Sequence, residues 1–201
     1  MIRTILRKRR LLAIYIIMVL VLFILPHFSV QGYTIMKNTT SHLGAQNTPN
    51  AWIMNLIFFL LGFITIQEAW IYLKQYWVQK FILTIFGLGL VGVAIFKHAP
   101  IFQGIPYSLF EDTIHSIFAS IVGFSFTLFT VSAAFIETTN KRRIIALLVG
   151  VVVTVLSVLM SSLPDFAGIW QRLIFIISFA WLIIFLKRLE GEMIVEKDLK
   201  Q

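Results

Sequence analysis

A histidine and two carboxylates lie close together near the start of a long apolar segment. Asp112 and Glu111 precede His115 by three and four residues, so either carboxylate would share a helical face with the imidazole. A carboxylate beside a histidine raises the basicity of the ring and orients it for proton transfer or metal binding. The spacing predicts either an acid–base pair or a hydrogen-bonded pair that only stabilises the helix end.

Further polar side chains that could contact a ligand lie in the same group of connections between apolar segments. Together with Glu111, the candidate ligand-binding residues are Asn38, Ser41, His42, Gln46, His98, Asp165 and Arg172. Ser41, Asp112 and His115 are the candidates for catalysis. Arg172 lies seven residues after Asp165 and about two turns into the predicted bilayer, so we expect it to pair with an acidic group or a lipid phosphate.

A zinc site is a further alternative for the imidazoles. His42, His98, His115 and Asp165 supply the ligand types that zinc takes, and three protein ligands plus water is the usual catalytic arrangement. No short ligand spacing such as His-x-x-x-His is present. The chain has no cysteine, which excludes disulfides, thiolate metal sites and a cysteine nucleophile.

The segments that must position these residues are predicted to be membrane-spanning helices. Of 201 residues, 59% are hydrophobic and 13% charged, and the mean hydropathy is +0.90. A water-soluble domain could not bury so much apolar surface. A spanning helix needs roughly 20 mostly apolar residues, so the sequence predicts an all-α, six-helix membrane bundle in one domain.

The apolar runs set the expected bounds of these helices. We expect spans near 11–30, 51–73, 81–96, 113–136, 144–160 and 169–186, with outer loops at 31–50, 97–112 and 161–168. Basic residues of Met1–Arg10 precede the first run, and no small-x-small cleavage site follows it, so we interpret this segment as an uncleaved span. Thr48 before Pro49, Ser108 and Asp165 are the predicted N-caps of the second, fourth and sixth spans.

The distribution of positive charge predicts the orientation. Fourteen of the seventeen Lys and Arg residues fall in the two termini and the connections after the second and fourth spans. Cytoplasmic loops carry such an excess, so we expect both termini in the cytoplasm. All four histidines then lie toward the outer side. The net charge of +8 reflects this topology and does not indicate a nucleic-acid partner.

Glycines in the third apolar run predict close helix packing. Gly87, Gly89 and Gly92 satisfy G-x-G-x-x-G, but the motif lies inside a span and does not follow a strand, as a dinucleotide site requires. Small residues at such positions let helices approach closely in lipid.

The stretch from Asn38 to Asn55 resembles the domain of unknown function 998 family of multi-pass prokaryotic membrane proteins. Ser41, Leu43, Gly44, Pro49 and Asn55 match the family's Ser-x-Leu-Gly, Pro and Asn pattern. His115 is similar to a histidine near the start of the family's fourth span. The resemblance implies a bacterial or archaeal plasma membrane and a six-helix bundle, and it brings no activity.

These observations support three functional hypotheses. The first is an outward-facing polar pocket that binds a lipid head group, a small solute or a partner protein. The second is a lipid hydrolase that uses His115 with Asp112 or Glu111, with or without zinc; the chain more distantly resembles the membrane metal hydrolases that include alkaline ceramidases, but lacks their closely spaced histidine pair. The third is a transporter or an oligomeric pore, although the span centres contain few ionisable residues.

Overall fold

The computed structural model describes residues 10–102 and 104–198, and helices dominate this part of the chain. The long helices are α2 (Arg10–Ile24), α4 (Ala51–Tyr72), α5 (Trp77–Ile95), α6 (Leu109–Ile136), α7 (Asn140–Ser162) and α8 (Ala167–Asp198). A short 3-10 helix, η1 (Leu25–Phe28), follows α2, and a second one, η2 (Pro164–Phe166), precedes α8. The short helix α3 (Thr40–Leu43) lies in the segment between η1 and α4. No strand occurs in the described ranges.

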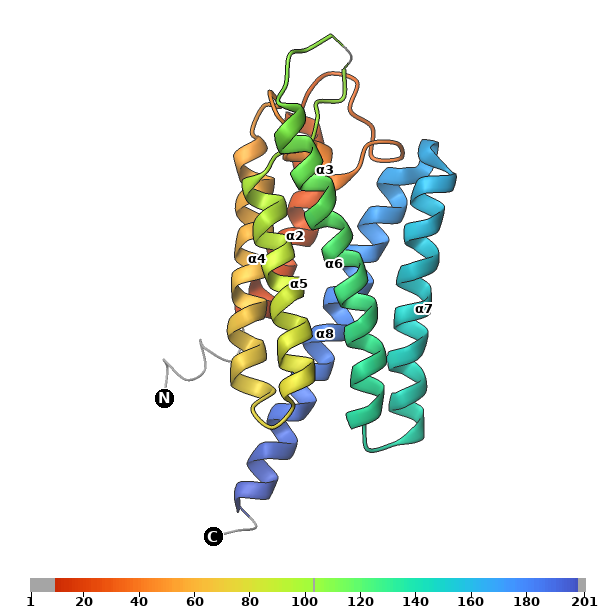
Figure 1. Cartoon of the computed structure of the whole chain (residues 1–201). Helices are drawn as coiled ribbons and strands as arrows, with labels where there is room; N and C mark the ends of the chain where they lie inside the picture. The colour runs from red at the N-terminus through yellow and green to blue at the C-terminus, as the bar shows by residue number, and fades with distance from the viewer. Residues whose placement is uncertain (1–9, 103, 199–201) are drawn as a thin grey trace.

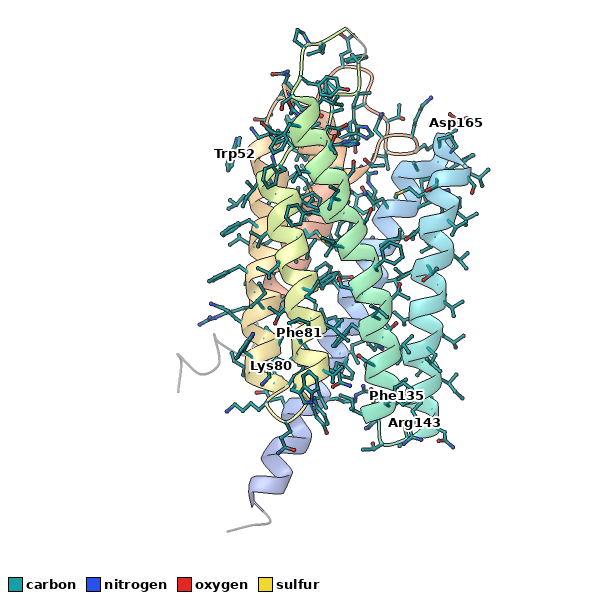
Figure 2. The ribbon with its side chains drawn as sticks, in the orientation of Figure 1. Trp52, Lys80, Phe81, Phe135, Arg143 and Asp165 are labelled. Carbon is teal, nitrogen blue, oxygen red and sulfur yellow. The ribbon has the colours of Figure 1, made fainter. Side chains whose placement is uncertain are left out.

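The six long segments, with η1 continuing α2, are long and apolar enough to cross a membrane, which confirms the predicted bundle. Apolar side chains cover its outside as well as its core: Phe81 is 62% exposed and Phe135 is 81% exposed (Figure 2). A surface of this kind is stable in lipid and not in water. The chain is therefore an integral membrane protein.

Glycines bring α5 close to both of its neighbours, as predicted. A Cβ on Gly87 would lie 2.7 Å from the carbonyl oxygen of Gly62 in α4. On the other side of α5, a Cβ on Gly92 would lie 2.3 Å from the ring of Phe118 in α6. Real Cβ atoms do not approach other atoms so closely, so α4, α5 and α6 pack at distances that only glycine permits.

The ends of the helices confirm one predicted cap and correct two. Ser108 caps α6 by accepting a hydrogen bond from the backbone N–H of Glu111, so this helix begins four residues earlier than its apolar run. Thr48 does not cap α4, because the Thr48 carbonyl accepts from the N–H of Ala51 at 3.2 Å in a turn. Proline followed by a residue with positive φ, here Asn50 at +59°, is typical of a type II turn.

Asp165 is not the N-cap of the last helix. It lies inside η2, and α8 begins at Ala167. An unpredicted cap occurs at Thr139, whose side chain accepts from the N–H of Arg142 at the start of α7. Capping lets α6 and α7 each begin about four residues before the apolar run, since polar residues are well accommodated in a capped first turn. The helix α5 also begins four residues before its apolar run, but its first turn has no side-chain cap.

The two ends of the bundle differ in composition. The loops that follow η1 and α5 and the turn at η2 lie at one end, which we call the histidine end (Figure 1). The turns after α4 and α6 and the C-terminal part of α8 lie at the other, which we call the basic end. Lys80 and Arg143 lie near the basic end, and Trp52 and Asp165 near the histidine end (Figure 2). The basic residues Arg3, Arg7, Lys8, Arg9 and Lys200 lie outside the described residues.

Candidate functional site

Arg172, near the start of α8, holds together the loop that follows η1. It is 2% exposed. Its guanidinium donates to five oxygens: the carbonyls of Leu22 (3.2 Å), Ile35 (3.0 Å), Asn38 (3.0 Å) and Gly168 (2.8 Å), and the hydroxyl of Tyr33 (2.7 Å). The expected pairing of Arg172 with a carboxylate or a lipid phosphate is therefore wrong: its hydrogen-bonding capacity is largely used by backbone carbonyls.

The carbonyl of Leu22 shows why an arginine is useful here. In a continuing helix it would accept from the residue four positions later, but that residue is Pro26, which has no N–H. Arg172 Nε supplies the missing donor. Tyr33 adds to this cluster by donating to the carbonyls of Asn38 and Thr39. Burial raises the pKa of Tyr33 above its ordinary value of 10.0, although the guanidinium opposes this shift.

Two further residues of α8 anchor the same loop. Gln171 Oε1 accepts from the backbone N–H of Thr40 at 2.6 Å and from the N–H of Ser41 at 3.3 Å, so it caps α3 from a distant helix. The backbone N–H of Gly168 donates to the carbonyl of Met36 at 2.8 Å. Sequence analysis missed both residues; a signal was available only in Gln171, a polar residue beside Arg172 within an apolar run.

Most of the predicted ligand-binding amides are also used within the protein. Asn38 Oδ1 accepts from the N–H of Thr34 at 2.8 Å. Gln46 Nε2 donates to the carbonyls of Lys97 and Ser108, and Gln46 Oε1 accepts from the N–H of Ser108 at 2.7 Å. Gln46 thus joins the two long loops of the histidine end, and its polar atoms serve the fold.

The motif residues Gly44 and Asn55 form a packed contact. Asn55 Nδ2 donates to the carbonyl of Gly44 at 3.0 Å. A Cβ on Gly44 would lie 2.2 Å from Asn55 Oδ1, so the asparagine and the absence of a side chain at position 44 are needed together. This contact fixes α3 against the start of α4.

Three imidazoles form a stack at the histidine end. The ring centroids of His42 and His98 are 4.8 Å apart, and those of His98 and His115 are 5.1 Å apart with only 5° between the ring planes. The three residues come from α3, from the segment after α5, and from α6. The structure therefore brings together three of the predicted site residues that lie far apart in the sequence.

Hydrogen bonds assign the ring nitrogens of this stack. His42 Nδ1 accepts from the N–H of Thr39 at 3.0 Å, which leaves the proton of the neutral ring on Nε2. His115 Nδ1 lies 2.8 Å from the carbonyl of Phe96, to which it must donate. Burial, and then the neighbouring His98 and His115, lower the pKa of His42 from 6.5 to about 4. The stack thus disfavours a charge on His42.

The sequence suggested that Asp112 could pair with His115. In the structure Asp112 pairs with His98 instead. His98 Nδ1 lies 2.5 Å from Asp112 Oδ1, which also accepts from the N–H of Ala99 at 2.7 Å. Glu111 is equally occupied, since its Oε2 accepts from the N–H of Lys97 at 3.2 Å. The expected acid–base pair on one face of α6 does not form, because both carboxylates turn toward the segment that follows α5.

The four predicted zinc ligands do not come together at one site either. Asp165 lies 3.2 Å from Lys37 Nζ, with 78% of its side chain exposed, and not among the imidazoles. Within the described ranges, no group of three or more His, Cys, Asp or Glu side chains is placed to hold a metal ion. Asp165 is held away from the stack because η2 lies at the α7–α8 turn.

A cavity of about 100 Å³ lies inside the bundle between α5, α6, α7 and α8. Its wall is mostly apolar and includes Phe86, Leu90, Phe126, Phe175 and Phe179. Ser41, Ser157, Gln171 and Ser178 are its polar lining residues. Ser41 is the one predicted site residue of the described chain that lines it, since the imidazoles lie outside its wall.

A buried ion pair that sequence analysis missed lies toward the basic end. Glu137 is 6% exposed and pairs with Arg188 of α8, while its backbone carbonyl accepts from Arg143 Nε at 2.9 Å. Glu137 directly follows α6 and is the C-cap of that helix. Its position between an apolar run and a basic cluster was the available signal. The pair joins the end of α6 to α8.

Comparison with known proteins identifies one similarity. The family model described as "Protein of unknown function (DUF998)" matches residues 12–187, and this confirms the resemblance first noted around Ser41 and Gly44. No curated protein and no solved structure matches the chain. The matched range includes the second to fifth spans, most of the first and the sixth, the histidine stack and the cavity.

Proposed function

This chain belongs to the DUF998 family, and we propose that it binds the apolar part of a membrane-resident molecule between its helices. The cavity between α5, α6, α7 and α8 carries this proposal. Protein interiors are close-packed, and a cavity of about 100 Å³ exceeds the space that one water molecule needs. Its apolar wall favours a hydrocarbon segment over water.

The polar groups of the histidine end support this choice over a head-group pocket in the loops. Asn38, Gln46 and Arg172 direct their polar atoms to backbone groups of the protein. A ligand there would have to displace these bonds, and an unpaired buried group costs about 1–3 kcal/mol. The cavity requires no such exchange, so we place the apolar part of the ligand there.

The hydrolase alternative gains no support from the contacts of His115. Its Nδ1 donates to a backbone carbonyl, and Asp112 is bound to a different histidine. The hydrolase hypothesis requires a carboxylate that orients His115 and raises its basicity, and that contact is not formed. We therefore propose binding and not hydrolysis.

We further propose that the histidine end faces outward from a bacterial or archaeal plasma membrane. The support is the positive charge of the basic end, where Lys74, Lys80, Lys141, Arg142 and Arg143 occur. Positive residues are retained on the cytoplasmic side during insertion. The molecule that occupies the cavity would then come from the outer half of the bilayer.

Filling the cavity tests the binding proposal. Gly123 lines the cavity, and a Cβ at this position meets no heavy atom within 4 Å. Gly123→Leu should therefore occupy the cavity while keeping the fold. Purified protein in nanodiscs would be irradiated with a phospholipid that carries a diazirine on its acyl chain. The wild type should be labelled at buried Phe126 and Phe179, and Gly123→Leu at least tenfold less.

Gly191→Leu is the matched control, because Gly191 is exposed on α8 and its Cβ also meets nothing within 4 Å. It should keep the wild-type labelling of Phe126 and Phe179. Exposed Phe124, at 75%, should be labelled equally in all three proteins. Labelling of the buried residues that is absent from the wild type, or equal in Gly123→Leu, would contradict the proposal.

A further inference from the structure

Two polar side chains of the cavity wall have groups that the fold does not use. Gln171 Nε2 and Ser41 Oγ make no hydrogen bond within the described residues, and both atoms keep accessible surface. By contrast, Ser178 Oγ is inaccessible, and Ser157 Oγ donates to the carbonyl of Val153 at 2.9 Å. The unused polar side-chain groups that the wall can offer to a ligand are therefore those of Gln171 and Ser41.

The contacts of Gln171 decide which atom of its amide is unused. Its Oε1 accepts from the N–H of Thr40 at 2.6 Å, from the hydroxyl of Thr40 at 2.5 Å and from the N–H of Ser41 at 3.3 Å. Only an oxygen accepts from backbone N–H groups, so the other amide atom must be the nitrogen. Its N–H groups are donors, and a molecule that pairs with them must present an acceptor.

The hydroxyl of Ser41 is a second donor beside this amide. The two residues are in contact, since the backbone N–H of Ser41 donates to Gln171 Oε1, and Ser41 is only 7% exposed. A buried donor without a partner costs about 1–3 kcal/mol, and hydrocarbon supplies none. One carbonyl oxygen has two lone pairs and can accept from both donors.

This pair of donors lies at the histidine end of the cavity. Gln171 is in the second turn of α8, which begins at Ala167, and Ser41 is in α3. Phe179, in the apolar wall, is eight residues after Gln171, which corresponds to about 12 Å along a helix. A molecule whose oxygen meets the donors can therefore extend a hydrocarbon chain along α8 to Phe179.

We propose that the ligand is an acyl ester, whose carbonyl oxygen accepts from Gln171 Nε2 and Ser41 Oγ while its hydrocarbon chain occupies the cavity. The inference rests on the proposed function, since it assumes that the cavity takes up a hydrocarbon chain. A neutral acceptor is favoured over a carboxylate or a phosphate, because no Lys, Arg or His of the described chain lines the cavity and an unpaired charge there would be far more costly.

Two matched probes test this pairing. The first is methyl hexadecanoate with a diazirine in the middle of its chain, and the second is the alkane of the same length with the diazirine at the same position. Each is irradiated with wild-type protein in nanodiscs, and the labelling of Phe179 is normalised to that of exposed Phe124. The ester should label Phe179 about fivefold more strongly than the alkane, as a net gain of about one hydrogen bond predicts.

Gln171→Glu removes the donor and keeps the anchor of α3. The carboxylate still accepts from the N–H groups of Thr40 and Ser41, but it cannot donate. At pH 8 the preference for the ester should be lost. A hexadecylammonium probe with the same diazirine should then label Phe179 at least fivefold more strongly than it labels Phe179 of the wild type, because the variant presents an acceptor and a negative charge.

Ser41→Ala leaves one of the two donors and should lower the preference for the ester to about twofold, with the labelling by the alkane unchanged. It keeps the Gln171 anchor, so it decides the pairing even where Gln171→Glu fails to fold. Ser157→Ala is the control, because Ser157 also lines the cavity but its hydroxyl is already bonded, and it should keep the fivefold preference.

The two probes separate this inference from the proposed function. If the alkane labels Phe179 but Ser41→Ala and Gln171→Glu keep the wild-type preference for the ester, the pairing is wrong while cavity binding stands. If neither probe labels Phe179 of the wild type, both proposals fail.

Discussion

Arg172 is a charged residue at the level of the apolar spans, and its hydrogen bonds explain how the bundle tolerates it. The guanidinium spreads its charge over four backbone carbonyls and a hydroxyl, and charge-assisted bonds of this kind are stronger than neutral ones. A buried arginine is costly unless all its donors are occupied. Here the hydrogen bonds of Arg172 offset this cost, and they join the loop after η1 to α2 and α8.

Arg172→Leu should destabilise the protein strongly. The substitution leaves the carbonyls of Leu22 and Ile35 without their donor inside an apolar environment, so we expect a loss of roughly 3 kcal/mol. The Tm in detergent, followed by circular dichroism, measures this loss. Lys37→Ala removes only the exposed pair with Asp165 and should change the Tm little. Equal effects of the two substitutions would disprove the role assigned to Arg172.

The histidine stack predicts a pH dependence of stability. The pKa of His42 is about 4 in the folded protein and about 6.5 in an unfolded chain. As the pH falls through this window, the unfolded state binds a proton that the folded state excludes, so stability decreases. The groups that face His42 are His98, His115 and Asp112. We expect the wild-type Tm to fall between pH 7 and pH 4.5.

His42→Gln should make this fall smaller, because glutamine cannot bind the proton but its Oε1 can still accept from the N–H of Thr39. His27→Gln is the control, since His27 is exposed on η1, and it should keep the wild-type slope. An unchanged slope in His42→Gln would show that another group causes the pH dependence.

At the scale of elements, the first turns of α8 organise the histidine end. Gly168, Gln171 and Arg172 contact the segment 34–41 from one helix face. The loop after η1 has little regular structure of its own apart from α3. Its backbone groups are satisfied by this face of α8, so its conformation depends on the packing of the last helix against the first.

Gly168→Ala should detach this loop. A Cβ would lie 2.3 Å from the carbonyl oxygen of Ile35 and 2.4 Å from that of Asn38, so the backbone must move. We expect at least tenfold faster hydrogen exchange of residues 34–41, measured by mass spectrometry. Gly191→Ala, where the Cβ meets nothing, should leave this exchange unchanged and stabilise α8 by up to about 1 kcal/mol. Unchanged exchange in Gly168→Ala would show that the close contact at Gly168 does not hold this loop against α8.

For the whole molecule, the separation of the two ends predicts opposite accessibility across the membrane. The chain has no cysteine, so single cysteines can be introduced cleanly. Met36 lies at the histidine end and Thr138 at the basic end; both are exposed and uncharged. On intact cells, a membrane-impermeant maleimide should label Met36→Cys, and Thr138→Cys only after permeabilisation. The reverse pattern would overturn the proposed orientation.

The architecture was predictable because hydropathy, charge and small-residue spacing are local properties. Six apolar runs, the cap at Ser108 and the glycine packing of α5 needed no knowledge of long-range contacts. The clustering of histidines at one end followed from the order of the spans. The prediction of an N-cap at Thr48 was wrong because Pro49 and Asn50 form a turn. A threonine before a proline is compatible with both a helix N-cap and a turn, so the sequence pattern did not separate the two.

The partner of each polar side chain was decided only by tertiary structure. Whether Asp112 binds His98 or His115 depends on where the segment after α5 returns to α6. Arg172 meets carbonyls from residues 134 to 150 positions away, and the cavity is bounded by four long helices. Such contacts arise from how helices pack, and neither residue type nor spacing along one chain segment encodes them.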